Sequence, residues 1–144
     1  MISSSKIQKV AAGIGFLAGL YMLFMGGIHF PMGEQLLQMS QFSGLPHQSQ
    51  DFLIMLCLVI GVCLVTFGVF TLYFANKIRV GNLKARWFFI IVGIMILVRS
   101  WVEWRYPIAL PDPDIFNLFN FLGFSLLYFI PGVLVQFNMK KEIV

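Results

Sequence analysis

Residues 87–107 read WFFIIVGIMILVRSWVEWRYP, and the interpretation of the whole chain starts from this stretch. Its first twelve residues are uncharged, then Arg99 appears, and Glu103 follows four residues later. On a helix that rises 1.5 Å per residue, Arg99 lies about 18 Å from Trp87, inside a hydrocarbon layer of about 30 Å. Ionisable side chains at such a depth are costly and usually mark a functional site. The stretch therefore predicts a membrane helix that carries a polar site.

The composition agrees with a membrane protein. Of 144 residues, 59% are hydrophobic and 11% are charged, whereas a soluble domain carries about 25% charged residues. Four apolar runs, separated by polar segments, predict membrane spans at residues 10–30, 52–74, 87–106 and 115–137. The expected fold class is an all-α integral membrane protein, a four-transmembrane-helix bundle that forms a single domain over residues 1–144.

The charges of the connecting segments predict an orientation. One side of the membrane would hold a single acid, Glu142, and eight basic residues: Lys6, Lys9, Lys77, Arg79, Lys84, Arg86, Lys140 and Lys141. The other side would hold the acids Glu34, Asp51, Asp112 and Asp114, with Arg105 at its edge. The positive-inside rule places both termini and the loop 75–86 in the cytoplasm, as in a multi-pass protein of the cytoplasmic membrane. Because the basic residues are spread over short loops, no nucleic-acid partner is expected.

Prolines mark two expected irregularities. Pro31 is expected to end the first span, and residues 34–42 then have the roughly helical spacing of a short helix that lies in the membrane interface. Ser43 to Pro46 would end that helix. Pro131 is expected to kink the fourth span, because proline removes a backbone donor and crowds the preceding turn.

Small residues predict close helix contacts. Gly15 and Gly19 form a GxxxG pair on one face of the first span, and Gly26 lies on the same face. Gly61 and Gly68 form a similar ridge on the second span. These faces are expected to pack inside the bundle of this chain, and the alternative is contact between copies in a homo-oligomer.

A polar cluster is expected in the outer leaflet. Arg99 and Glu103 are spaced to pair on one helix face, and an antiparallel fourth span brings Asn117 and Asn120 to a similar depth, within about 10 Å of the surface. His29 at the end of the first span completes the predicted cluster. Three roles stay open for it: a structural clamp between helices, which is favoured, a ligand site, and a contact with a partner subunit.

A metal site is a sharper alternative on the same side of the membrane. His29, Glu34, His47 and Asp51 offer two imidazoles and two carboxylates, which suit a transition metal. Their spacing matches no compact ligand motif, so ordinary loop and cap roles are favoured. The sequence also has no Cys-x-x-Cys motif, no glycine-rich phosphate loop and no recognisable nucleophile with a base.

These observations favour a non-catalytic accessory or structural subunit of a larger membrane complex. The expected partners are the lipid bilayer and other membrane protein subunits, or further copies of the chain. One alternative is a binder or transporter of a small molecule, a lipid or a quinone that uses the outer-leaflet cluster. The other is a subunit of a membrane oxidoreductase that holds a metal or a haem. The sequence identifies no cofactor.

Overall fold

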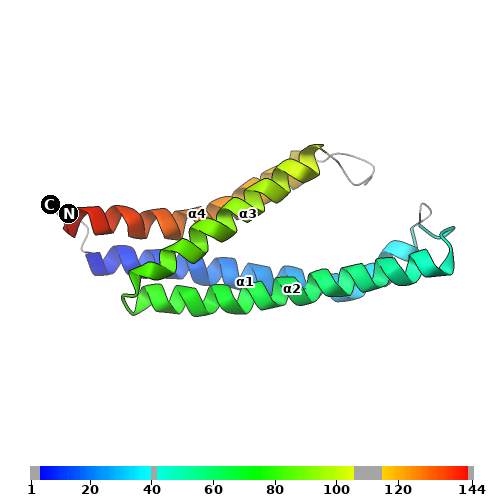
Figure 1. Ribbon diagram of the computed structural model, residues 1–144, viewed down its shortest axis with the longest axis horizontal. Coiled ribbons are helices and arrows are strands. Elements are labelled where there is room, and N and C mark those ends of the chain that lie inside the picture. The colour runs from blue at the N-terminus through cyan, green and yellow to red at the C-terminus, as the bar shows by residue number, and fades with distance from the viewer. Residues whose placement is uncertain (1–3, 40–41, 106–114, 143–144) are drawn as a thin grey trace. The chain divides into compact units, whose positions relative to one another are not determined.

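Helices joined by turns make up the part of the chain that the structure describes (Figure 1). The computed structural model describes residues 4–39, 42–105 and 115–142, and the side chains of residues 6–39, 42–102 and 122–137. Its elements are α1 (Ser4–Leu37), α2 (His47–Arg79), the short 3₁₀ helix η1 (Leu83–Ala85), α3 (Arg86–Arg105) and α4 (Ile115–Glu142). The all-α prediction is confirmed, and the described positions of each predicted span lie within one helix.

Three of these helices are long and apolar enough to cross a membrane, namely Lys6–Leu37, His47–Arg79 and Leu83–Val102. The described side chains of α4 add a shorter apolar segment, Leu122–Phe137. The first three expected spans therefore have the length and composition of membrane helices, and a fourth crossing by α4 stays a prediction.

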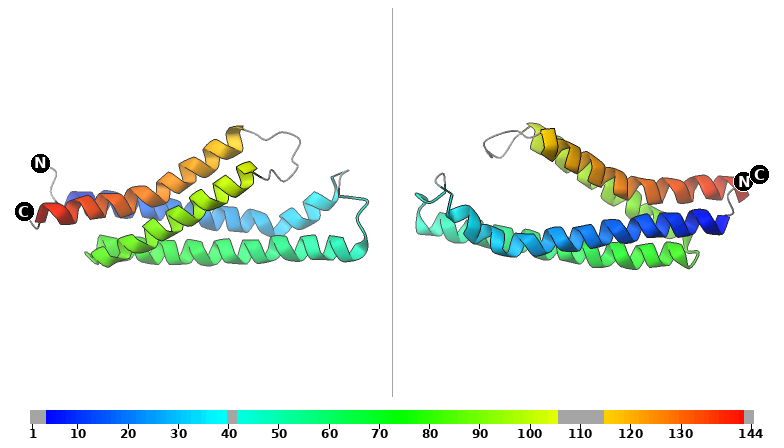
Figure 2. Two further views of the ribbon diagram at one scale, coloured as in Figure 1. Left: turned by 45° about the horizontal axis from the view of Figure 1, so that its top comes forward. Right: turned by 180° about the vertical axis from the view of Figure 1, so that it is seen from behind.

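The first helix continues through Pro31, so the prediction of a separate interfacial helix over residues 34–42 is wrong. α1 runs to Leu37, and the residues described after it form turns. Packing explains the continuation: Gly33 is buried, and a Cβ atom added to it would lie 2.8 Å from Cα of Ile54 on α2. This close approach stabilises the last turns of α1 although proline lacks a backbone donor. Figure 2 shows α1 changing direction toward its cyan end, as prolines commonly cause.

The chain divides into two compact units. The first contains Met1–Ala18 and Thr71–Val144, and the second contains Gly19–Phe70. The single domain expected over residues 1–144 stays a prediction.

In the second unit, α1 and α2 run side by side and touch through glycines (Figure 1). A Cβ atom on Gly26 would lie 2.8 Å from the backbone nitrogen of Val65, and one on Gly61 would lie 3.1 Å from the carbonyl oxygen of Gly26. A Cβ atom on Gly68 would lie 2.8 Å from the side chain of Leu23. Real Cβ atoms essentially never come as close as 2.8 Å, and 3.1 Å is tighter than most of their contacts, so glycine at these positions lets the two backbones approach closely.

In the first unit, the start of α1 and the end of α2 belong to the same compact body as α3 and α4. Phe89 and Tyr128 are fully buried in it. Gly15 faces Phe89, since a Cβ atom added to the glycine would lie 2.8 Å from that ring. Gly19, the second member of the predicted GxxxG pair, is buried and belongs to the second unit. Figure 2 shows a bend along α4, the helix that contains Pro131.

Candidate functional site

The pairing of α3 with α4 positions most of the predicted polar cluster. Ser125 Oγ donates a hydrogen bond to the carbonyl oxygen of Gly93 over 3.1 Å. A Cβ atom on Gly93 would lie 3.1 Å from Phe129, and one on Gly132 would lie 2.6 Å from the side chain of Ile90. The two helices are therefore antiparallel and close. The same register, continued along both helices, places position 103 level with 117 and position 100 level with 120.

One side of the α3–α4 pair is marked by Phe89 and Tyr128, whose ring centroids lie 6.0 Å apart. At about 100° per residue, position 103 lies within about 40° of Phe89 on α3, and position 117 lies within about 20° of Tyr128 on α4. Positions 99 and 120 are each about 80° from the same marker residues. Gly93 and Ser125, where the two helices meet, lie about 40° and 60° from the same markers in the opposite rotational sense. Positions 103 and 117 thus lie near the marked side, whereas positions 99 and 120 lie on the outer edges of the pair, away from the helix contact. A common α3–α4 polar face (positions 99, 103, 117 and 120) therefore stays a prediction.

The side chains of this face are described only in part. Arg99 is exposed, whereas the side chains of Glu103, Asn117 and Asn120 lie outside the described residues. An ion pair between Arg99 and Glu103, and its hydrogen bonds to the asparagines, therefore stay predictions.

His29, the fifth predicted member of the cluster, belongs to the second unit. Its ring is half-buried, and Nδ1 donates a hydrogen bond to the carbonyl oxygen of Met25 over 2.7 Å. This bond fixes the ring against its own helix. A histidine held in this way is typical of a packing position near a helix crossing, and its Cβ lies 3.3 Å from a Cβ atom added to Gly61.

The predicted metal ligands are not brought together. His29, Glu34, His47 and Asp51 all have described side chains, and the last three of them are exposed. No three His, Cys, Asp or Glu residues within the described part of the chain lie close enough to hold a metal ion.

A buried hydroxyl pair escaped the sequence interpretation. Thr71 Oγ1 and Tyr128 Oη lie 2.8 Å apart and are both fully buried, so they join α2 to α4 in the first unit. The ring of Phe124 meets Tyr128 edge-on at 5.4 Å between centroids. Thr71 and Tyr128 both lie inside predicted spans, where a polar side chain commonly forms a hydrogen bond with another helix. Their position in apolar segments is therefore the sequence feature that could have indicated a contact. Two neutral hydroxyls in an aromatic setting form a structural clamp.

Comparisons with protein-family models, with curated proteins and with solved structures find no match.

Proposed function

We propose that the chain crosses the cytoplasmic membrane four times, with both termini in the cytoplasm, and serves as a non-catalytic subunit of a larger membrane assembly. One observation supports the membrane placement most directly. α2 contains the most apolar 18-residue window of the three candidate spans, and yet only 17% of that window is buried, against 39% in α1 and 33% in the α3 region. In a water-soluble fold the most apolar helix lies in the core. Here it lies at the surface, which suits a bilayer.

The exposed surface of α2 forms one continuous stripe. Its residues are spaced by three, four or seven positions and are each more than half exposed: Phe52, Met55, Val59, Val62 and Val69. Thr66 lies within the stripe and satisfies its hydroxyl by donating to the carbonyl oxygen of Val62 over 2.8 Å. The stripe thus needs no water, and lipid or another membrane helix can cover it.

The subunit role is tested by purification of the tagged chain from native membranes in a mild detergent, followed by native mass spectrometry. The expected result is a complex of fixed stoichiometry that contains other membrane proteins. The variant Val62→Trp, which enlarges the exposed stripe without entering the helix crossing, should weaken that complex if the stripe contacts a partner. A chain that is isolated only as a monomer or a homo-oligomer contradicts the subunit role.

A second candidate function is the binding of a small molecule, a lipid or a quinone at the α3–α4 polar face. The observation that favours it is the exposed side chain of Arg99 within an apolar helix; the helix register brings position 99 to a depth similar to that of positions 103, 117 and 120. An exposed guanidinium suits a carbonyl or an anionic group of a ligand. Extraction of purified protein, with mass analysis of the extract, should show a ligand that is lost in Arg99→Gln. Equal extracts from the two proteins contradict this function.

A further inference from the structure

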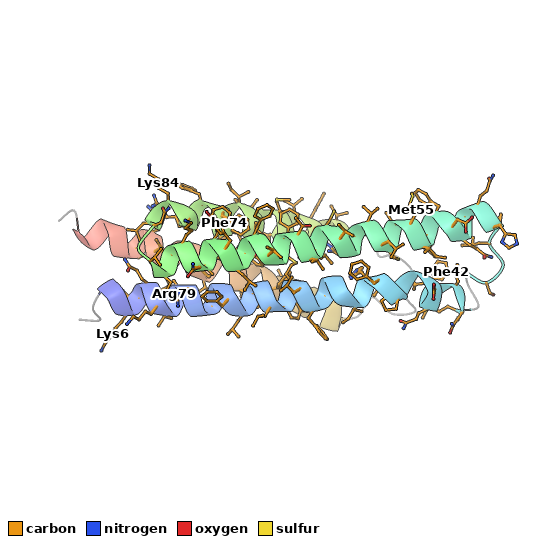
Figure 3. The ribbon with its side chains drawn as sticks, turned by 90° about the horizontal axis from the view of Figure 1, so that it is seen from below. Lys6, Phe42, Met55, Phe74, Arg79 and Lys84 are labelled. Atoms are coloured by element: carbon orange, nitrogen blue, oxygen red, sulfur yellow. The ribbon has the colours of Figure 1, made fainter. Side chains whose placement is uncertain are left out.

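Basic residues from three elements gather at one end of the first unit. Figure 3 shows Lys6 of α1, Arg79 of α2 and Lys84 of η1 at the same end. Lys77 and Arg86 lie in the same stretch of chain as the last two. The sequence has no aspartate or glutamate in residues 1–33 or 52–102, so the segments that carry these five cations contain no acid to offset them.

The turn from α2 into α3 is stiff at its first half. The backbone N–H of Asn82 donates to the carbonyl oxygen of Lys77 over 2.8 Å, and that of Gly81 donates to Ile78 over 3.0 Å. These two bonds, with Gly81 at a φ of 92°, form a Schellman motif that ends α2. Glycine adopts this left-handed conformation without strain.

The second half of the turn is fixed by side chains. Asn82 caps η1, because its Oδ1 accepts a hydrogen bond from the backbone N–H of Lys84 over 3.2 Å. Arg86 Nη1 donates to the carbonyl oxygen of Leu83, also over 3.2 Å. Arg79 Nε donates to Asn76 Oδ1 over 3.1 Å. An ordered backbone therefore carries the cations, so a ligand that binds them loses less conformational entropy than it would on a flexible loop.

Aromatic rings flank the turn on both sides. Lys77 Nζ lies 5.0 Å from the ring centroid of Tyr73, and the guanidinium carbon of Arg86 lies 5.2 Å from the ring of Trp87. Both rings are about half exposed. Tyrosine and tryptophan at the ends of membrane helices favour the level of the lipid headgroups. The cations held over these rings would then lie at the depth of the phosphates.

We propose that this turn, residues 77–86, binds the headgroup of an anionic phospholipid. Lysine and arginine donate charge-assisted hydrogen bonds to phosphate oxygens, and basic pockets at the cytoplasmic ends of membrane helices suit such headgroups. A stripe of exposed apolar residues begins at Trp87 and continues along α3 through Ile91, Ile94 and Val98, where an acyl chain can lie. This stripe favours a lipid over a free anion. The inference rests on the proposed membrane placement and not on the subunit role.

The test is native mass spectrometry of the purified, detergent-solubilised chain with phosphatidylglycerol or phosphatidylcholine at equal concentrations. The wild-type chain should retain the anionic lipid preferentially. The double variant Arg79→Gln with Lys84→Gln should lower its affinity by at least about tenfold, because each basic residue near an anionic headgroup contributes measurably. The matched control, Lys140→Gln with Lys141→Gln, removes the same charge from the end of the chain, outside the five cations, and should stay near wild type. Circular dichroism verifies that each variant is folded.

Three results overturn the proposal. If the wild-type chain retains the two lipids equally, it has no preference for anionic headgroups. If the two double variants lose the same affinity for the anionic lipid, the binding depends on net charge and not on the turn. Displacement of the lipid by inorganic phosphate at matching concentration shows a site for a free anion. A chain that purifies without detergent contradicts the membrane placement itself. This outcome is distinct from equal retention of the two lipids, which contradicts only the headgroup preference. A failure of the subunit role would be seen only in the purification from native membranes, and it would not change these lipid-binding measurements.

Discussion

At the scale of single residues, the hydroxyl pair of Thr71 and Tyr128 is the best-defined polar contact between helices. We expect Tyr128→Phe to lower the free energy of unfolding by about 0.5–1.5 kcal/mol, the net contribution of one hydrogen bond. The loss should stay moderate because a threonine hydroxyl in a helix can turn to the carbonyl oxygen four residues earlier. Unfolding by denaturant in micelles measures it.

Two further variants make this expectation specific. Tyr73→Phe removes a hydroxyl from an exposed tyrosine and should be close to neutral. Thr71→Val combined with Tyr128→Phe should cost less than the two single losses added together, because the bond can be lost only once. If the losses in the free energy of unfolding of the two single variants add up to that of the double variant, this contradicts a direct hydrogen bond between the two hydroxyls.

Arg99 and Glu103 carry the second prediction at this scale. We expect Arg99→Ala and Glu103→Ala each to destabilise the chain or abolish its function, and the double variant to be milder than the sum, since it leaves no orphan charge. The exposure of Arg99 indicates losses smaller than the about 3–5 kcal/mol that follow when a fully buried pair is broken. Thermal melts of the three variants in detergent decide between coupled and independent side chains, and additive losses contradict the pair.

At the scale of elements, neighbouring glycines of α1 provide a matched comparison. A Cβ atom on Gly26 would meet the backbone of Val65 at 2.8 Å, whereas one on Gly27 would meet nothing within 4 Å. We expect Gly26→Ala to destabilise the chain by about 1–3 kcal/mol through overpacking. Gly27→Ala should be neutral or stabilising, because alanine has the higher helix propensity. Unfolding of both variants in the same detergent measures the difference, and a larger loss for Gly27→Ala contradicts the observed packing of α1 on α2.

Helix ends could not be predicted as well as helix centres. Apolar runs locate the centres because a membrane helix must be apolar over about 20 residues. The ends depend on contacts that the sequence does not display. α1 passes Pro31 because Gly33 fits against Ile54, and α2 begins at His47, five residues before the apolar run, with Pro46 accepting its first backbone bonds. Both extensions add polar turns to apolar helices.

At the scale of the whole molecule, the candidate site could also be predicted only in part, because it depends on contacts between helices that the sequence does not display. Helical periodicity predicts which residues share one face of one helix, and the register of α3 with α4 brings positions 103 and 117 to the same level. Periodicity does not predict which helices are neighbours, so the bond between Thr71 and Tyr128 was not foreseen. Periodicity also does not predict which residues of different helices come together: within the described part of the chain, no three His, Cys, Asp or Glu residues lie close enough to hold a metal ion.

Helix length leads to a prediction about the whole molecule in the membrane. α1 has 34 residues and α2 has 33, so each is about 50 Å long at 1.5 Å per residue, well beyond a hydrocarbon layer of about 30 Å. In the proposed membrane placement, both helices therefore extend beyond the hydrocarbon layer. The polar start of α2, residues 47–51, and the basic turn 77–86 are the segments that suit opposite surfaces.

Single cysteines at Ser49 and Lys84 test this arrangement in a chain whose native Cys57 and Cys63 are replaced by alanine. Ser49→Cys should react with a membrane-impermeant maleimide in intact cells, because the positive-inside rule places that end outside. Lys84→Cys should react only after the membrane is opened. An Ile60→Cys control, near the middle of α2, should stay unreactive in both conditions, since thiolate formation and reagent entry both need water. Labelling of Ser49→Cys and Lys84→Cys from the same side contradicts the crossing of α2, and with it the four-span topology on which the lipid-binding turn depends.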